Sequence, residues 1–138
     1  MKRLLGIDLG RSRTGVAISD ELGLLAHPLE TIATRSADDL AKRIRQIVTE
    51  KNVEQIVVGL PRHMNGTFGE GAKGAEAFAE KLRRLVKCEV VTWDERLSTV
   101  AAERALQAAG KKTRDTREVR DQVAAQMILQ NYLDRLSA

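Results

Sequence analysis

The sequence predicts an α/β domain in which helices cover a mixed β-sheet. Two patterns carry this prediction. The N-terminal part contains three predicted strands with short gaps, and the remainder alternates helical spacing with short apolar strands. The third observation is length, because 138 residues can bury a sizeable core without disulfides or metals. We therefore expect one domain that covers residues 1–138.

The first three predicted strands cover residues 4–9, 14–19 and 29–33. Their short connections favour an antiparallel meander. Alternation along the first strand places Asp8 on the same face as Gly6 and Gly10. We expect these two glycines to leave open space above the Asp8 carboxylate, where a metal ion or a phosphate group can approach.

Helices and strands alternate after the meander. Ser36, followed three residues later by Asp39, predicts the start of the first helix. We then expect a strand at 55–59, a mobile glycine-rich loop at 61–74, a helix at 75–85, a strand at 89–93, a helix at 98–109 and a last helix from about residue 115. Strands that follow helices make the predicted sheet mixed.

Composition limits the class of protein. The net charge of +4 is compatible with a polyanionic partner, whereas an aromatic content of 3% argues against base stacking as the main mode of nucleic-acid binding. Cys88 is the only cysteine, so no intrachain disulfide can form and a reducing compartment is expected. His27 and His63 have no partner at zinc-ligand spacing. Without a signal peptide or a run of about 20 apolar residues, we expect a cytoplasmic protein with no membrane partner.

Acidic residues in apolar surroundings are the most informative feature. Asp8 ends the first strand, and Asp121 heads the apolar stripe of the last helix. Asp94 and Glu95 follow another strand, and because neighbours on a strand face opposite sides, only one of them is expected to join Asp8. A carboxylate in an apolar setting is costly unless a positive charge meets it. Three that converge predict a divalent metal site.

Such a site suits phosphodiester hydrolysis. Two Mg²⁺ or Mn²⁺ ions about 4 Å apart activate a water molecule and stabilise the leaving oxygen, and hard ions of this kind prefer carboxylate oxygens. Basic residues flank the carboxylates in the sequence and are candidates for binding phosphates. They are Arg11, Arg13, Arg96, Lys111, Lys112, Arg114 and Arg117.

Four stretches of the sequence together resemble the YqgF (RuvX) family in order and spacing. They are residues 6–20, residues 57–61 with 64–66, residues 94–99, and Asp121 with the small and apolar residues at 124, 125, 128 and 129. The resemblance spans nearly the whole chain and implies a ribonuclease H-like fold, with a five-stranded sheet of three antiparallel strands followed by parallel ones, related to the RuvC resolvases. It implies a cytoplasmic nuclease that matures the 5′ end of pre-16S rRNA. By motif, Asp8, Glu95 and Asp121 are the implied catalytic, metal-binding acids, and Ser98 stands where the family usually has Thr.

Other functions remain open at this point. The chain could resolve Holliday junctions in branched DNA, or it could be a non-catalytic RNA-binding factor in ribosome assembly. Residues 7–17 also resemble the first phosphate loop of actin-like ATPases, but those enzymes close two domains around ATP and this chain has room for one. We expect a nucleic-acid partner, either pre-rRNA or branched DNA, together with the ribosome or its precursor. A monomer and a homodimer are both compatible with the sequence.

Overall fold

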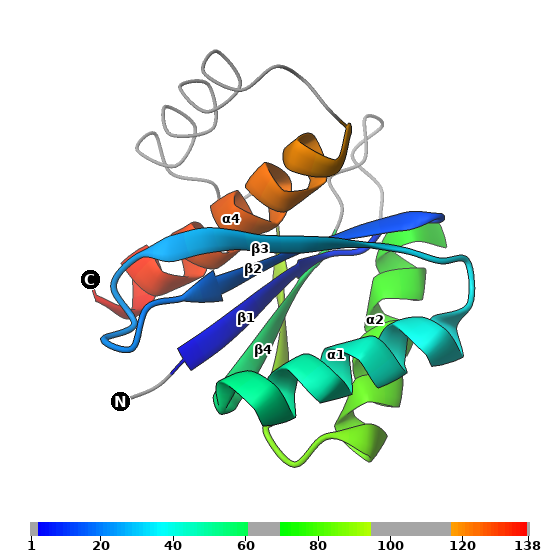
Figure 1. The fold of residues 1–138 in the computed structure, drawn as a ribbon, viewed down its shortest axis with the longest axis horizontal. Helices are drawn as coiled ribbons and strands as arrows, with labels where there is room; N and C mark the ends of the chain where they lie inside the picture. Colours follow the sequence, from blue (N-terminus) through cyan, green and yellow to red (C-terminus); the bar gives the residue numbers. More distant parts are fainter. Residues whose placement is uncertain (1–2, 61–69, 95–116, 138) are drawn as a thin grey trace.

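A five-stranded mixed sheet forms the centre of the computed structural model, which describes residues 3–60, 70–94 and 117–137 (Figure 1). The strands are β1 (Arg3–Asp8), β2 (Arg13–Ser19), β3 (Ala26–Ala33), β4 (Val53–Leu60) and β5 (Glu89–Asp94). The described helices are α1 (Ala37–Lys51), α2 (Glu70–Leu85) and α4 (Arg117–Leu136).

The strand order is β3-β2-β1-β4-β5, and it confirms the predicted mixed sheet. β1, β2 and β3 pair antiparallel, whereas β4 and β5 run parallel to β1. The last residues of β1, β4 and β5 therefore lie at one edge of the sheet, which we call the carboxyl edge. In open α/β sheets the space outside this edge is a common place for binding and catalysis.

Helices cover both faces of the sheet (Figure 1). Successive side chains of β1 point to opposite faces of the sheet. Leu5 and Ile7 therefore lie in the core formed with α1 and α2, and Leu4 lies in the core formed with α4. Asp8 follows the alternation of Leu4 and therefore lies on the α4 side. The fold thus presents the first predicted carboxylate to the helix that carries the third.

Close contact between α4 and the sheet depends on glycine. A Cβ atom added at Gly6 would lie 2.7 Å from the Cβ of Leu129, and one at Gly15 would lie 1.8 Å from the backbone oxygen of Asp121. The expectation of open space above Asp8 next to Gly6 is therefore wrong, because α4 fills that space. At Gly10 an added Cβ would meet the backbone oxygen of Arg13 at 1.9 Å, so that glycine serves the turn between β1 and β2.

Element boundaries differ from the prediction by three residues or more in two places. The predicted glycine-rich loop 61–74 is too long, because α2 begins at Glu70 and includes Gly74. The third strand begins at Ala26 and not at residue 29, and it tolerates Pro28 because β3 is an edge strand. The predicted helix at 98–109 lies outside the described residues.

The first helix begins as predicted. The Ser36 side chain accepts a hydrogen bond from the backbone N–H of Asp39 at 3.2 Å, and Asn52 ends the helix in the left-handed conformation, with a φ of 54°. This cap fixes the start of α1 close to the carboxyl edge, because α1 follows the end of β3, which pairs with the start of β2.

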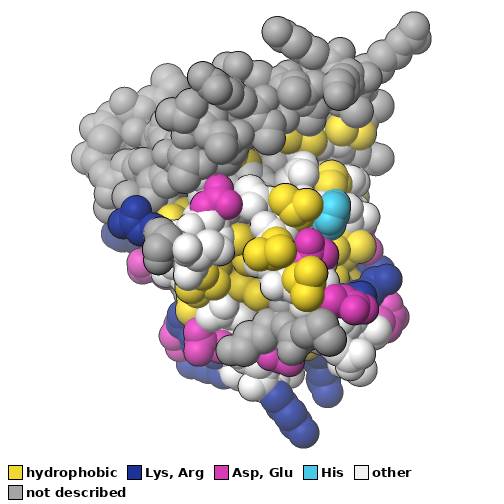
Figure 2. All heavy atoms as spheres, turned by 90° about the vertical axis from the view of Figure 1, so that its left-hand side faces the viewer, with side chains coloured by type: hydrophobic (Ala, Val, Ile, Leu, Met, Phe, Trp, Pro, Cys, Tyr) yellow, Lys and Arg dark blue, Asp and Glu magenta, His cyan; other side chains and the backbone are white. Residues whose placement is uncertain are grey.

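Exposed leucines gather at the opposite end of the molecule from the carboxyl edge. Leu22, Leu24 and Leu25 lie in the turn between β2 and β3, and Leu136 lies in the last turn of α4. Figure 2 faces this end and shows hydrophobic side chains among acidic and basic ones. None of the helices in the described residues has the length and apolar character that crossing a bilayer requires.

Candidate metal centre

Two of the predicted carboxylates come together at the carboxyl edge. Asp8 pairs with Gly15 across β1 and β2, and the backbone of Asp121 packs directly on Gly15. The last residue of β1 and the first turns of α4 therefore meet across one glycine. The close contact between α4 and the sheet continues one turn further along the helix. There the backbone oxygen of Ala125 would lie 3.0 Å from a Cβ atom added at Gly6.

The electrostatics of Asp8 reflect its partly buried position. Burial and, to a smaller extent, the nearby negative charge of Asp121 together raise the pKa of the Asp8 carboxyl from 3.8 to about 6. The structure assigns Asp8 no ion pair with any of the described residues. A cation at this position would favour the ionised form of Asp8 and relieve its repulsion from Asp121.

Asp121 already has a cationic neighbour. The Nε atom of Arg13, the first residue of β2, donates a hydrogen bond of 2.9 Å to Oδ2 of Asp121. The Asp121 side chain is 22% exposed, so this is a partly buried ion pair. The sequence predicted Arg13 only as a phosphate-binding residue and missed its bond to Asp121. The sequence does carry a signal for this bond. Arg13 and Gly15 are two residues apart in β2, so both lie on the face of the strand that α4 covers.

Asp94 lies on the other side of the sheet from Asp8. In β5, Trp93 packs with the core on the α4 side, and alternation turns Asp94 toward α1 and α2. Within the described ranges, no three Asp, Glu, His or Cys side chains lie close enough together to hold a metal ion. Asp94 therefore does not complete a site with Asp8 and Asp121.

Several predicted residues fall outside the described part of the chain. Glu95 is one of them, so the structure does not test its predicted role. The same holds for Arg96, Lys111, Lys112 and Arg114, and for the side chain of Arg117, whose backbone opens α4. Arg11 is described and lies exposed in the turn after β1.

Trp93 lies on the α4 side of β5. Its ring meets the ring of Tyr132 from α4 edge to face, with centroids 5.5 Å apart and planes at 85°. The indole Nε1 atom is buried and has no hydrogen-bond partner in the described part of the structure. This aromatic pair joins the end of β5 to the C-terminal half of α4.

The sheet and the carboxylate pair define a ribonuclease H-like α/β protein. The structure is similar to that of RuvC from Thermus thermophilus in complex with a Holliday junction substrate, with a TM-score of 0.64 and 15% sequence identity, covering 99% of this chain and 96% of that chain. It is also similar to the fowlpox virus Holliday junction resolvase, with a TM-score of 0.59 and 10% identity, over 96% of this chain and 99% of that one. At these identities the similarity establishes the fold.

The family follows from the sequence comparison. Residues 2–135 match the family model described as "RuvX: Holliday junction resolvase", so the chain belongs to the RuvX family. A relative from Geobacillus kaustophilus, named "Putative pre-16S rRNA nuclease", is 54% identical over 134 residues, which cover 96% of this chain and 97% of the relative. A relative of the same name from Halalkalibacterium halodurans is 47% identical over 135 residues, 96% of each chain. The resemblance drawn from the sequence motifs is confirmed, and the chain is a member of a family of enzymes that hydrolyse phosphodiester bonds.

Proposed function

We propose that this chain is a divalent-metal-dependent endonuclease that processes the 5′ end of pre-16S rRNA in the cytoplasm. The meeting of Asp8 and Asp121 at the carboxyl edge is the observation that carries the proposal. Two adjacent carboxylates, one of them partly buried without a cation of its own, form a donor set that suits a hard divalent ion.

Asp8 and Asp121 would each hold the metal, Mg²⁺ or Mn²⁺, through a carboxylate oxygen. When bound, the metal supplies an activated water and charge stabilisation for the leaving oxygen. We assign the third carboxylate to Glu95, since Asp94 turns to the other side of the sheet. Arg13 occupies one oxygen of the Asp121 carboxylate through its Nε hydrogen bond, and we place its guanidinium group beside the centre, where it can also contact a substrate phosphate.

The substrate class rests on the relatives and on charge. Curated relatives at 47–54% identity carry the name of a pre-16S rRNA nuclease. The net charge of +4 favours a polyanion. We propose that the basic residues predicted from the sequence contact its phosphates on the ribosome precursor, namely Arg11, Arg13, Arg96, Lys111, Lys112, Arg114 and Arg117.

Resolution of branched DNA is the second candidate function. Two observations favour it: the description of the family model, and the similarity of the fold to a RuvC that binds a Holliday junction. Because resolution needs two cuts placed symmetrically, this function requires a dimer, whereas cleavage of a single RNA strand does not.

Side-by-side cleavage assays test both candidates. Labelled pre-16S rRNA and a four-way DNA junction are incubated with the protein and Mg²⁺ or Mn²⁺, and Asp8→Asn serves as the variant without the first carboxylate. We expect metal-dependent cleavage of the RNA by the wild type and a loss of at least about a hundredfold in Asp8→Asn. Equal cleavage by both proteins would overturn the proposed mechanism, and preference for the junction would favour the second function.

A thermal assay separates an enzyme from a non-catalytic assembly factor. A metal that binds only the folded state at about a hundred times its dissociation constant stabilises that state by about 2.7 kcal/mol. We expect Mn²⁺ to raise the melting temperature of the wild type and to leave Asp8→Asn nearly unchanged. A melting temperature that ignores Mn²⁺ in both proteins would favour an RNA-binding factor whose acids are structural.

A further inference from the structure

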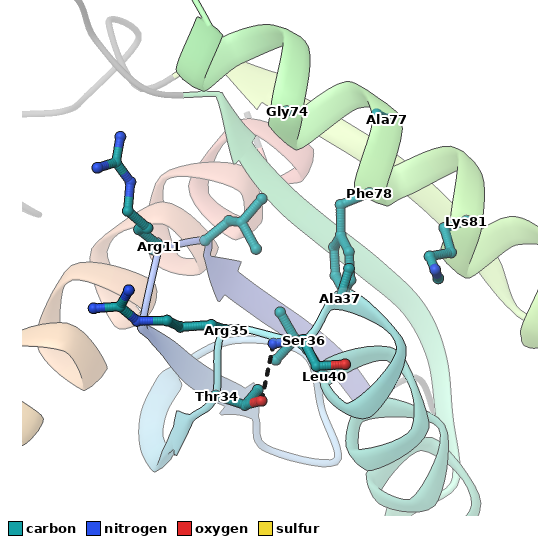
Figure 3. Close-up of a pocket in the computed structure, with 12 residues that line it drawn as sticks. Arg11, Thr34, Arg35, Ser36, Ala37, Leu40, Gly74, Ala77, Phe78 and Lys81 are labelled. Carbon is teal, nitrogen blue, oxygen red and sulfur yellow. Dashed lines mark hydrogen bonds between the residues drawn. The ribbon is translucent and has the colours of Figure 1, made fainter.

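A pocket lies beside the candidate metal centre, on the other face of the sheet. Its volume is about 250 Å³, and it opens between the end of β1, the start of α1 and the middle turns of α2 (Figure 3). Leu9, Gly10 and Arg11 form part of its wall, and they follow Asp8 directly in the chain. At about 3.8 Å per residue, the Cα atom of Gly10 lies no more than about 8 Å from that of Asp8.

The floor of the pocket is apolar. Leu40 of α1 and Phe78 of α2 are 4% and 5% exposed, and Figure 3 shows the Phe78 ring reaching from α2 toward the start of α1. Thr34 and Ser36 add two hydroxyl groups to the lining. Each hydroxyl oxygen accepts a backbone N–H, from Ser36 and Asp39 respectively. Within the described part of the chain, each O–H hydrogen remains available for a ligand acceptor.

The rim of the pocket carries cations. Arg11 and Arg35 are exposed, and Figure 3 shows both side chains extending to the same side of the pocket. Neither forms an ion pair with any described residue, whereas Lys81 on the other side is neutralised by Asp38. The pocket thus combines an apolar hollow for one small ring system with two uncompensated positive charges at its mouth.

We propose that this pocket receives one unstacked nucleobase of the nucleic-acid substrate, while Arg11 and Arg35 hold the adjoining phosphate. The inference rests on the proposed nuclease function, because it places the base next to a phosphate within reach of Asp8. An apolar hollow accepts the ring, the hydroxyl groups of Thr34 and Ser36 face its polar edge, and the two guanidinium groups match the charge of the backbone. The pocket volume of about 250 Å³ accommodates a single base.

Gly74 offers a direct way to fill the pocket. It lies in α2 and lines the pocket, and an added Cβ would have no neighbour within 4 Å. Gly74→Leu therefore fills the hollow without disturbing the core, and Gly74→Ala is the matched control that removes the glycine and adds little volume. Ala77→Leu, one turn along the same wall, is a second filling variant.

The test compares two short single-stranded RNAs of equal length, one intact and one with abasic sites, by fluorescence anisotropy in EDTA so that no strand is cut. We expect the wild type and Gly74→Ala to bind the intact strand about tenfold more tightly than the abasic one. Gly74→Leu and Ala77→Leu should lose this preference, with unchanged affinity for the abasic strand. Arg11→Gln combined with Arg35→Gln should weaken the binding of both strands by the same factor.

Retention of the preference for the intact strand in folded Gly74→Leu and Ala77→Leu would overturn the pocket assignment. In that case metal-dependent cleavage by the wild type would leave the proposed function standing. A wild type that neither binds these strands nor cleaves RNA or junctions with Mn²⁺ would overturn both.

Discussion

Asp8 is the residue whose charge depends most on its surroundings. Its pKa is raised from 3.8 to about 6, so the folded chain holds the Asp8 proton more tightly than the unfolded chain does. The contribution of Asp8 to stability is therefore greatest below pH 3.8, declines as the pH rises toward 6 and is lost above it. At about 1.4 kcal/mol per pKa unit, ionising Asp8 in the folded protein costs up to about 3 kcal/mol.

This cost predicts that Asp8→Asn is more stable than the wild type without metal at pH 8. We expect a gain on the order of 2 kcal/mol in the free energy of unfolding at pH 8 and a much smaller difference at pH 4. Urea unfolding in EDTA at the two pH values measures it. Glu54→Gln, at an exposed position of β4, is the control and should change neither value. A wild type that is more stable than Asp8→Asn at pH 8 would contradict this account of the Asp8 site.

Arg13 competes with a metal ion for Asp121. Its hydrogen bond of 2.9 Å occupies one carboxylate oxygen, and a pair of this exposure contributes up to about 1 kcal/mol. We expect Arg13→Gln to bind Mn²⁺ two- to fivefold more tightly, as measured by isothermal titration calorimetry. Arg3→Gln breaks the comparable pair between Arg3 and Glu21 away from the centre and is the matched control. Weaker Mn²⁺ binding by Arg13→Gln would contradict this competition and would show that Arg13 favours metal binding.

At the scale of elements, the docking of α4 on β2 positions the centre. A Cβ atom at Gly15 would lie 1.8 Å from the backbone oxygen of Asp121, so Gly15→Ala must push α4 away from the sheet. We expect a loss of roughly 3 kcal/mol in stability together with a loss of metal-dependent cleavage. Gly74→Ala makes the same substitution inside α2, where nothing opposes it, and should raise stability by up to about 1 kcal/mol. Thermal and urea unfolding of the two variants measure both changes in stability. Equal changes for Gly15→Ala and Gly74→Ala would contradict the close packing of α4 on Gly15.

Local patterns in the sequence predict the elements correctly where short-range interactions determine them. Alternation placed Asp8 correctly on β1, and Ser36 with Asp39 located the start of α1. The start of α2 was missed because Gly71 and Gly74 suggest a loop, although packing of the later turns stabilises the helix through them. The ion pair between Arg13 and Asp121 joins residues 108 positions apart. The strand period puts Arg13 on the same face as Gly15, but its partner depends on how α4 docks, and that docking is not a local property of the sequence.

Charge acts at the scale of the whole molecule. Each phosphate contact on a single strand contributes about −0.7 to the slope of log K against log salt concentration. The seven basic residues that the sequence predicts as phosphate contacts, together with Arg35, therefore predict a slope between about −5 and −6 for single-stranded RNA. We expect Arg11→Gln to reduce this slope by about 0.7, which anisotropy titrations over a range of KCl concentrations can measure. A slope near zero would contradict an interface built on phosphate contacts.

The pairing of Trp93 with Tyr132 gives the molecule an internal optical probe. Trp93 is the only tryptophan in the chain, so all indole fluorescence comes from the junction of β5 and α4. Its emission maximum depends on the polarity around a ring that α4 shields from solvent. Departure of α4 from the sheet shifts this emission to longer wavelength, and unlabelled protein mixed rapidly with metal or RNA reports the rate of any such movement.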